Sequence, residues 1–297
     1  MTTPATLRGA ITAIVTPFQQ DGQVDEGALA AFVDWQVAEG IHGLVPVGST
    51  GEAVTLSLAE RERVVRITVE RAKGRVPVIA GAGSNDTAAA IEASRVLAKA
   101  GATHLLHVSP MYNKPPQRGL LAHFRAIADA APVPVVLYNV PGRTASNMAA
   151  ETTLALAEHE NIVAVKEASG NLSQIDQILR GRPEGFTVLS GDDGVTLAVM
   201  AAGGHGVISV ISNAVPKLVA QLTDALVKSD LATASLIHHR LAPLVDAAFV
   251  ESNPIPIKAA LAMMGKMQNV LRLPLVPLDA RHEAHLSAAL RIAGVSL

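Results

Sequence analysis

Residues 162–167 read Ile-Val-Ala-Val-Lys-Glu, and residues 171–180 shortly after them read Asn-Leu-Ser-Gln-Ile-Asp-Gln-Ile-Leu-Arg. The first run is short, apolar and rich in β-branched residues, which is typical of a buried strand. In the second run, apolar residues return every three or four positions, as they do on one face of an amphipathic helix. A strand followed by a helix is the repeating unit of a parallel α/β fold.

The same alternation extends in both directions along the chain. Strands are predicted at 11–15, 43–47, 77–81, 104–109, 134–138, 162–166, 187–190 and 206–210, with helical patterns between them such as 25–39, 58–73, 86–100 and 117–130. Ser57 with Glu60 predicts a near capping box, and Asp86 predicts a helix N-cap. Gly74 and Gly101 stand where a helix end needs a left-handed residue. Eight successive units predict an α/β fold of the (β/α)8 TIM-barrel class, through about residue 228.

The remainder of the chain contains only helical patterns, at 230–249, 255–266 and 279–293. We therefore expect two regions. Residues 1–228 form the barrel with the active site, and residues 229–297 form a C-terminal helical appendage packed on it. The segment Asn253-Pro254-Ile255-Pro256 is expected to act as the hinge of this appendage.

Composition excludes several classes of function. The 297 residues are 49% hydrophobic and 17% charged with a net charge of −2, which gives no electrostatic footprint for nucleic acid or an anionic membrane. The absence of cysteine removes disulfides, thiolate metal sites and cysteine nucleophiles. Residues 1–8 lack the pattern of a signal peptide, and no apolar run reaches the ~20 residues of a membrane span. We expect a soluble cytoplasmic protein.

Lys166 is the unusual residue of the strand 162–166. Side chains alternate along a strand, so Lys166 shares a face with Ala164 and Ile162. The other seven lysines lie in helical or loop contexts, where a solvated charge is expected. Burial would lower the pKa of Lys166, and a neutral amine is what Schiff-base chemistry on a carbonyl requires. The alternative is an ion pair with a nearby carboxylate, or a head group that reaches solvent.

Polar residues gather at the predicted carboxyl ends of the strands, where such barrels hold their active sites. The chain's two tyrosines, Tyr112 and Tyr138, both fall there, and each is followed by asparagine. The turn Gly48-Ser49-Thr50-Gly51 can present backbone N–H groups to an anion, although a plain turn explains it equally well. Arg143 follows a tight turn after the strand of Tyr138, and arginine suits carboxylate recognition, with a surface or ion-paired arginine as the alternative.

The sequence gives little support for a metal site or a nucleotide-binding site. No G-x-x-x-x-G-K-S/T phosphate loop occurs. The closely spaced histidine pairs are His104 with His107, His238 with His239 and His282 with His285. Their spacing on strands and helices forms no convincing ligand set. We expect no metal and no organic cofactor.

Several motifs together resemble a known family. They are Gly48-Ser49-Thr50-Gly51-Glu52, Tyr112-Asn113, Tyr138-Asn139-Val140-Pro141, Lys166-Glu167-Ala168-Ser169-Gly170, Gly191-Asp192-Asp193 and Asn253-Pro254-Ile255-Pro256-Ile257-Lys258. In this order they resemble the dihydrodipicolinate synthase/N-acetylneuraminate lyase family of class I aldolases, over essentially the whole chain. Within it the chain is more similar to the synthase branch, which condenses pyruvate with L-aspartate 4-semialdehyde in lysine and diaminopimelate biosynthesis.

The resemblance implies a role for each matching residue. Lys166 would form the Schiff base, Tyr138 would relay protons, and Tyr112 would reach into the site of a neighbouring subunit of a homotetramer. Ser49 would link the two tyrosines. The backbone amide of Thr50 would hold the pyruvate carboxylate, Arg143 would receive the carboxylate of the aldehyde, and Gly191 and Ile208 would contact substrate.

One departure keeps rival functions open. The synthases usually carry threonine where this chain has Ser49, and sialic acid lyases carry serine. The alternative is therefore another pyruvate-dependent lyase or dehydratase of the family, acting on a 2-keto sugar acid, although those lyases usually lack an arginine matching Arg143. A non-catalytic pyruvate-binding protein is a more remote alternative.

The family's lysine-inhibited members share an inter-subunit pocket that is altered in this chain. The matching positions hold Leu58, Arg61, Ala89 and Met111, with Asn85 retained. A bound lysine would lose a carboxylate partner for its ammonium group there, so we expect no feedback inhibition by L-lysine.

Overall fold

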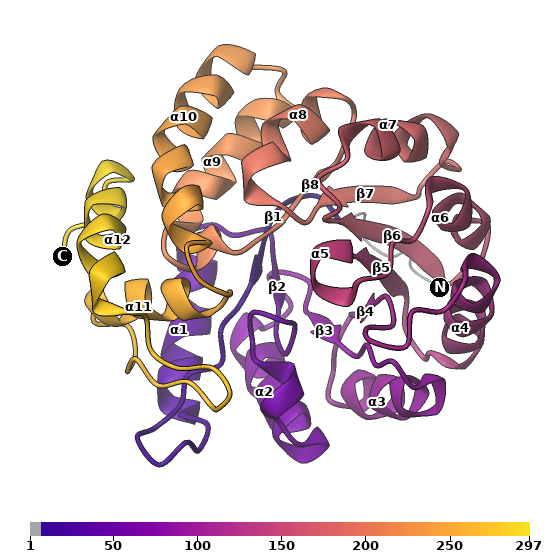
Figure 1. Cartoon of the computed structure of the whole chain (residues 1–297), viewed down its shortest axis with the longest axis horizontal. Coiled ribbons are helices and arrows are strands. Elements are labelled where there is room, and N and C mark those ends of the chain that lie inside the picture. Colours follow the sequence, from indigo (N-terminus) through magenta and orange to yellow (C-terminus); the bar gives the residue numbers. More distant parts are fainter. Residues whose placement is uncertain (1–6) are drawn as a thin grey trace.

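The computed structural model of the protein describes residues 7–297, in which eight parallel strands form a barrel with helices outside it (Figure 1). The strands are β1 (Gly9–Ala13), β2 (Gly43–Val45), β3 (Ile79–Gly81), β4 (His104–Val108), β5 (Val135–Asn139), β6 (Ile162–Glu167), β7 (Thr187–Ser190) and β8 (Gly206–Ser209). Each coincides with a predicted strand to within a few residues. The predicted (β/α)8 barrel is therefore confirmed.

The barrel closes through a seam between its two shortest strands. Hydrogen-bonded neighbours follow the order β2-β1-β8-β7-β6-β5-β4-β3. Between β2 and β3 a parallel bridge pairs Leu44 with Val78, and the backbone N–H of Gly81 donates to the carbonyl oxygen of Pro46 at 3.1 Å. These contacts join the first and last strands of that order.

The helices of the barrel connect its strands on the outside. They are α1 (Glu26–Ala38), α2 (Leu58–Ala72), α3 (Thr87–Lys99), α4 (Gln117–Ala130), α6 (Ala150–Ala157), α7 (Leu172–Gly181), α8 (Thr196–Ala201) and α9 (Pro216–Val227). Four short elements instead follow the carboxyl ends of strands: the helix α5 (Pro141–Thr144) after β5 and the 3-10 turns η1 (Ala53–Thr55), η2 (Asp193–Val195) and η3 (Ile211–Asn213) after β2, β7 and β8. No helix among residues 7–297 combines the length and hydrophobicity needed to span a membrane.

Local sequence signals explain where several helices begin and end. The capping box at α2 is complete, since the Glu60 side chain accepts from the Ser57 backbone and the Ser57 hydroxyl accepts from the Glu60 N–H. Asp86 caps α3 as predicted. Gly101 takes the left-handed conformation after α3 at φ +99°. At the end of α2 the left-handed turn already starts at Lys73, one residue before the predicted Gly74.

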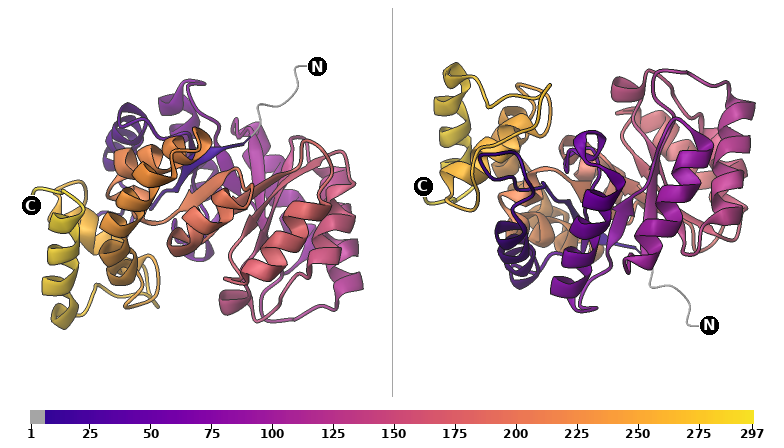
Figure 2. Two further views of the ribbon diagram at one scale, coloured as in Figure 1. Left: turned by 90° about the horizontal axis from the view of Figure 1, so that it is seen from above. Right: turned by 90° about the horizontal axis from the view of Figure 1, so that it is seen from below.

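The three predicted C-terminal helices are present as α10 (Leu231–Ala248), α11 (Ile255–Met263) and α12 (Ala280–Ile292), and they lie together on one side of the barrel, next to α1 and α9 (Figures 1 and 2). One hydrophobic cluster contains Phe32 of α1, Leu244 of α10 and Leu290 of α12, so this region shares its core with the barrel. Residues 253–256 do not form the expected hinge, because they are buried and hydrogen-bonded to the barrel. They anchor α11 rather than allow it to swing.

The strand register places two of the predicted site residues side by side. Tyr138 on β5 pairs with Lys166 on β6. Both stand at the carboxyl ends of their strands, where the short helix α5 lies near the centre of the ring (Figure 1). The active site is therefore expected at this end of the barrel.

Candidate active site

A cavity of about 460 Å³ lies at the carboxyl ends of the strands. Its lining includes Ser49, Thr50, Tyr138, Arg143, Lys166 and Gly191 from the barrel, and Val245, Asp246, Phe249 and Asn253 from the C-terminal region. Six of the eight residues predicted for the site thus meet in one cavity. The C-terminal region contributes part of its wall, which the sequence did not reveal.

Lys166 is the buried amine of this cavity. Its residue is 5% exposed, and its Nζ lies 4.3 Å from the centre of the Tyr138 ring. Within residues 7–297 it forms no ion pair, so the ion-pair interpretation does not hold. Burial lowers the pKa of Lys166 to about 8, the carboxylate of Asp193 works against this shift, and Arg143 adds to it. The amine is therefore substantially neutral at mildly alkaline pH.

Gly191 is what leaves room for the Lys166 side chain. A Cβ atom on residue 191 would lie 3.0 Å from both Cγ and Cε of Lys166, and 2.7 Å from the Cβ of Ala168. Any side chain at this position would displace the amine. Gly191 thus acts by its small size, in addition to lining the cavity.

Tyr138 is positioned as a proton donor. Burial raises the pKa of Tyr138 to about 12, while Arg143 and a hydrogen bond with the Ser49 side chain lower it by smaller amounts. The phenol therefore stays protonated at neutral pH and can donate to an oxygen atom in the cavity. Ser49, the next hydroxyl in this chain of hydrogen bonds, can pass a proton on.

The loop of Ser49 and Thr50 presents free backbone amides. In this turn the N–H of Gly51 donates to Gly48 at 3.1 Å and the N–H of Glu52 donates to Ser49 at 3.2 Å. The N–H groups of Ser49 and Thr50 have no acceptor in the part of the chain that the structure describes. Adjacent unpaired amides facing a cavity form a concave site for an anion such as a carboxylate.

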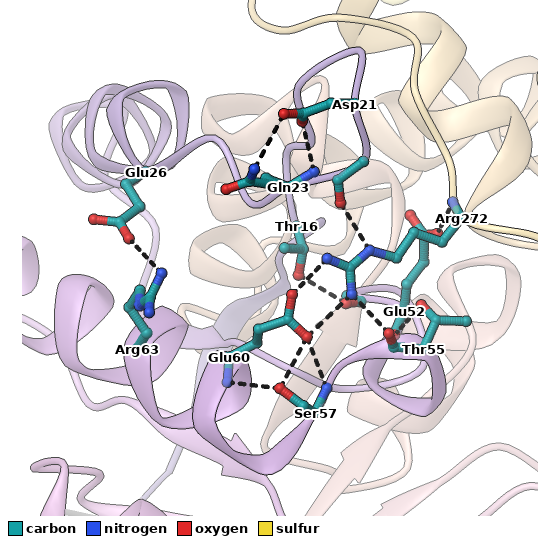
Figure 3. A network of polar contacts seen from close by, with 12 residues as sticks. Thr16, Asp21, Gln23, Glu26, Glu52, Thr55, Ser57, Glu60, Arg63 and Arg272 are labelled. Atoms are coloured by element: carbon teal, nitrogen blue, oxygen red, sulfur yellow. Dashed lines mark hydrogen bonds and ion pairs between the residues drawn. The ribbon is translucent and has the colours of Figure 1, made fainter.

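A buried ion pair holds the loop of Ser49 and Thr50 in place. Glu52 and Lys258, whose side chains are 0% exposed, lie 2.7 Å apart, and the Lys258 ammonium also donates to the carbonyl oxygen of Thr16. The backbone N–H of Arg272 donates to the second carboxylate oxygen of Glu52. Figure 3 shows how the guanidinium of Arg272 continues the network to Glu60 and the loop carbonyls. The expectation that all lysines other than Lys166 are solvated is wrong for Lys258.

Arg143 and Asn253 meet across the cavity wall. The guanidinium of Arg143 donates to the backbone oxygen of Asn253 at 3.0 Å, and the Asn253 side chain donates to the Thr50 hydroxyl at 2.9 Å. Arg143 itself is exposed on the cavity rim. Its charge is therefore available to a substrate carboxylate that enters from solvent.

Two predicted residues do not line the cavity. Tyr112 is 89% exposed, has φ +72°, a strained value for an aromatic residue, and is not among the residues that line the cavity. Ile208 is fully buried in the inner barrel core, because it lies one layer below the cavity floor. Val210, two residues further on and thus on the same face, makes the contact there instead.

Several site residues were missed by the sequence analysis. Asp193 is buried, accepts hydrogen bonds from the backbone of Val210 and Ile211, and supports the positive charge of Lys166. Asp246 and Asn253 come from a region interpreted as an appendage. The motifs Gly191-Asp192-Asp193 and Asn253-Pro254 were noticed, but nothing in their spacing showed that these side chains meet Lys166.

Comparison with known proteins agrees with this geometry. The model of the dihydrodipicolinate synthetase family matches residues 6–293. The chain belongs to this family. The 4-hydroxy-tetrahydrodipicolinate synthase of Maridesulfovibrio salexigens is 50% identical over 291 residues, which are 98% of this chain and 99% of the relative. The enzyme of the same name from Koribacter versatilis is 51% identical, covering 97% of each chain.

Solved structures of the family are closely similar as well. The chloride-inhibited dihydrodipicolinate synthase of Acinetobacter baumannii, complexed with pyruvate, superimposes with a TM-score of 0.96 at 40% identity, covering 98% of this chain and 100% of that one. The enzyme of Cyanidioschyzon merolae with lysine bound gives 0.94 at 44% identity, covering 97% and 98%.

Proposed function

We propose that the protein condenses pyruvate with L-aspartate 4-semialdehyde to 4-hydroxy-tetrahydrodipicolinate, with Lys166 as the Schiff-base lysine. The observation that carries this proposal is a buried amine without an ion-pair partner in the described chain, paired across two strands with a tyrosine and facing a cavity. A family member of 40% identity has been solved in complex with pyruvate. The activity is that of a lyase in lysine and diaminopimelate biosynthesis. Its site residues and its cytoplasmic location are part of the proposal.

The first half of the reaction uses the barrel residues alone. The carboxylate of pyruvate binds the free amides of Ser49 and Thr50, which leaves its keto carbon facing the amine of Lys166. The neutral amine adds to this carbon, and Tyr138 donates the proton that lets the carbinolamine hydroxyl leave as water. The cationic imine draws electrons from the methyl group, so that a methyl proton passes to the Tyr138 oxygen, which gave up its own proton in the step before, and an enamine forms.

The second half joins the two substrates. Arg143 binds the carboxylate of the aldehyde, and the enamine carbon attacks the aldehyde carbon to form the new carbon–carbon bond. The amino group of the aldehyde substrate then adds to the imine carbon and displaces the Lys166 amine, which closes the ring and restores the enzyme. Every step uses side chains or backbone amides of the protein itself, and none of them calls on an organic cofactor or a metal.

The charges around the cavity favour an amino-acid aldehyde over a sugar acid. Arg143 lies on the rim with Asp192 and Asp246, so that a cation and two carboxylates line one cavity. This is the complement of a substrate that carries both a carboxylate and an ammonium group. A 2-keto sugar acid can donate hydrogen bonds from its hydroxyl groups, but it carries no ammonium group to balance the charge of the two acidic side chains.

Tyr112 supports an assembly in which subunits share residues. Its side chain is exposed on a strained backbone and does not line the cavity of its own chain, and Val54 is 91% exposed as well. We place Tyr112 in the site of a partner within a homotetramer, a dimer of dimers. Mixing the inactive variants Lys166→Ala and Tyr112→Phe tests this. Heterodimers should regain activity, because one site then holds Lys166 with an intact partner Tyr112, whereas a tyrosine acting within its own chain gives no recovery.

The activity itself is tested with purified protein in a coupled assay. We expect turnover with pyruvate plus L-aspartate 4-semialdehyde and none with N-acetylneuraminate. Cleavage of the sugar acid at a comparable kcat/KM would contradict the assignment. Imine formation with pyruvate but no turnover with either substrate would point to a binding protein.

A further inference from the structure

A cavity of about 500 Å³ lies outside the barrel, on the side of the molecule where α1, α9, α10 and α12 come together (Figure 1). Its walls are formed by the end of α1, the first turns of α9, the middle of α10 and the segments that follow α11 and α12. It shares no lining residue with the cavity of Lys166. It is therefore separate from the active site.

Three cations from separate segments line this outer cavity. They are Lys217 of α9, Arg240 of α10 and Lys266 in the segment after α11. None of the three forms an ion pair with a carboxylate of residues 7–297. Glu39 is the one acidic residue among the described lining residues, so three cations against one carboxylate leave an excess of two positive charges. This excess stands out in a chain whose net charge is −2.

Two of these cations are held in place by neutral groups. The Nε of Arg240 donates to the carbonyl oxygen of Ile292 at 3.2 Å, and its terminal nitrogens have no acceptor among the described residues. Gly294 makes room for the guanidinium, because a Cβ atom at this position would overlap one of these terminal nitrogens. The Nζ of Lys266 lies 4.3 Å from the centre of the Trp35 ring, a cation–π contact that keeps the charge. These contacts position the two charges without neutralising them.

The first turn of α9 adds backbone donors to the charges of the side chains. Pro216 occupies the first position of this helix, and the N–H groups of Lys217 and Leu218 have no acceptor among the described residues. Unpaired amides at the start of a helix interact favourably with an anion. The amides and the three side-chain cations thus favour the same class of ligand.

We propose that this outer cavity binds a phosphate monoester of a small, hydroxyl-bearing molecule. The phosphate group contacts Lys217, Arg240 and Lys266, and the hydroxyl groups contact the polar lining residues Gln221 and Ser296. A phosphate monoester is favoured over a single carboxylate because it carries nearly two negative charges, which match the excess positive charge, and accepts hydrogen bonds on three oxygens. The volume of the cavity falls within the range typical of sites for small organic ligands, so there is room for more than the phosphate group.

Glycerol 3-phosphate is a suitable probe, with its sulfonate analogue as the match of lower charge. Binding is measured by titration calorimetry on the whole protein, at pH 8 and constant ionic strength. At this pH the phosphate group carries two negative charges, because its second pKa is about 6, whereas the sulfonate carries one. We expect glycerol 3-phosphate to bind the native protein, and the sulfonate to bind at least about tenfold more weakly, because half of the charge that the cations attract is missing.

Two variants and a matched control locate the site. Arg240→Gln and Lys217→Gln should each weaken the binding of glycerol 3-phosphate by at least about tenfold, because a charge-assisted hydrogen bond is lost. Lys217→Arg keeps the charge and should keep most of the affinity. Arg291→Gln removes an exposed arginine of α12 that does not line the cavity, and this variant should bind like the native protein.

The proposal is overturned if glycerol 3-phosphate does not bind at millimolar concentration, or if it binds the native protein and both glutamine variants equally well. Equal affinity of the sulfonate would refute the phosphate as the group recognised, and equal affinity of inorganic phosphate would refute the contacts of the hydroxyl groups. Saturating pyruvate should leave the affinity unchanged, because the two cavities share no residue, whereas competition would place the ligand at Lys166. These measurements need no turnover, so they are independent of the function proposed above.

Discussion

The protein buries two lysines within one barrel, and their surroundings differ in two respects: a carboxylate is bonded to one amine, and a cavity faces the other. Lys258 is completely enclosed, and its ammonium lies 2.7 Å from the carboxylate of Glu52. Lys166 is almost as buried, yet it faces a cavity and forms no ion pair within the described chain. Burial lowers the pKa of both amines, but only for Lys258 does a directly bonded carboxylate hold the proton. The comparison teaches that burial alone does not make an amine reactive; the missing counter-ion does.

The largest expected effect comes from replacing each lysine by methionine, which keeps the length of the side chain. Lys258→Met leaves the Glu52 carboxylate buried and unpaired, which should lower the free energy of unfolding by about 3–5 kcal/mol. Lys166→Met removes a buried amine that forms no ion pair in the described chain and should leave stability within about 1 kcal/mol, while kcat falls by at least about a thousandfold. Urea unfolding measures the stability of both variants, and the coupled assay measures their kcat.

The double variant Glu52→Gln/Lys258→Met serves as the control. Without the unpaired carboxylate it should recover part of the stability lost in Lys258→Met. Similar losses of stability in Lys166→Met and Lys258→Met would show that the two lysines do not differ as described.

Arg143 tests the cavity at its rim. Arg143→Ala should leave imine formation with pyruvate nearly intact, because the proposed contact of the guanidinium is with the second substrate and burial, not Arg143, is the largest cause of the lowered pKa of Lys166. The kcat/KM for L-aspartate 4-semialdehyde should fall by roughly thirtyfold or more, as expected for a lost charge-assisted bond of ~2–5 kcal/mol. Steady-state kinetics with each substrate varied in turn separate the effect on pyruvate from the effect on the aldehyde. Equal losses for both substrates would make Arg143 a structural residue, through its bond to Asn253.

The pKa of Lys166 predicts a moderate pH effect. The protonated amine is not a nucleophile, so imine formation should rise as pH increases through the lowered pKa of about 8. Between pH 7 and pH 9 the neutral fraction grows by roughly tenfold, and the rate of imine formation at low pyruvate should follow. Trapping the imine with borohydride after short reaction times, at several pH values between 7 and 9, measures this rate. A rate that is flat from pH 7 to 9 would mean that the amine is already neutral or that another step limits the reaction.

For L-lysine we expect no inhibition, which is the smallest effect among these predictions. Arg61, Asn85, Ala89 and Met111 line one cavity, and none of the described residues that line it is an aspartate or a glutamate, so the two ammonium groups of L-lysine find no carboxylate there. A titration with L-lysine to millimolar concentration should leave the rate unchanged. Saturable inhibition in that range would contradict the charge assigned to this cavity.

Short-range patterns in the sequence predicted much of this molecule. The apolar run before Lys166 and the capping box at Ser57 are local signals, so strands, helices and the barrel followed from them. The cavity was predictable as far as it consists of strand ends, since parallel strands of a barrel bring these ends together.

Long-range pairing could not be predicted in the same way. The partner of Lys258 lies 206 positions away, and that of Asn253 lies 203 positions away, so no local pattern could place them. Lys258 stands in a helix with ordinary spacing and therefore resembled a solvated lysine. Ile208 was assigned to the cavity because it ends a strand, and only the stacking of side chains inside the barrel shows that Val210 lies above it.

The contrast between the two buried lysines is tested most directly by trapping the imine. Native protein is treated with borohydride in the presence of pyruvate, and the adduct is located by peptide mass spectrometry. The account predicts one reduced pyruvate adduct per chain, on Lys166, and an unmodified Lys258. An adduct on Lys258 or another lysine, or no adduct in protein that turns over both substrates, would contradict it.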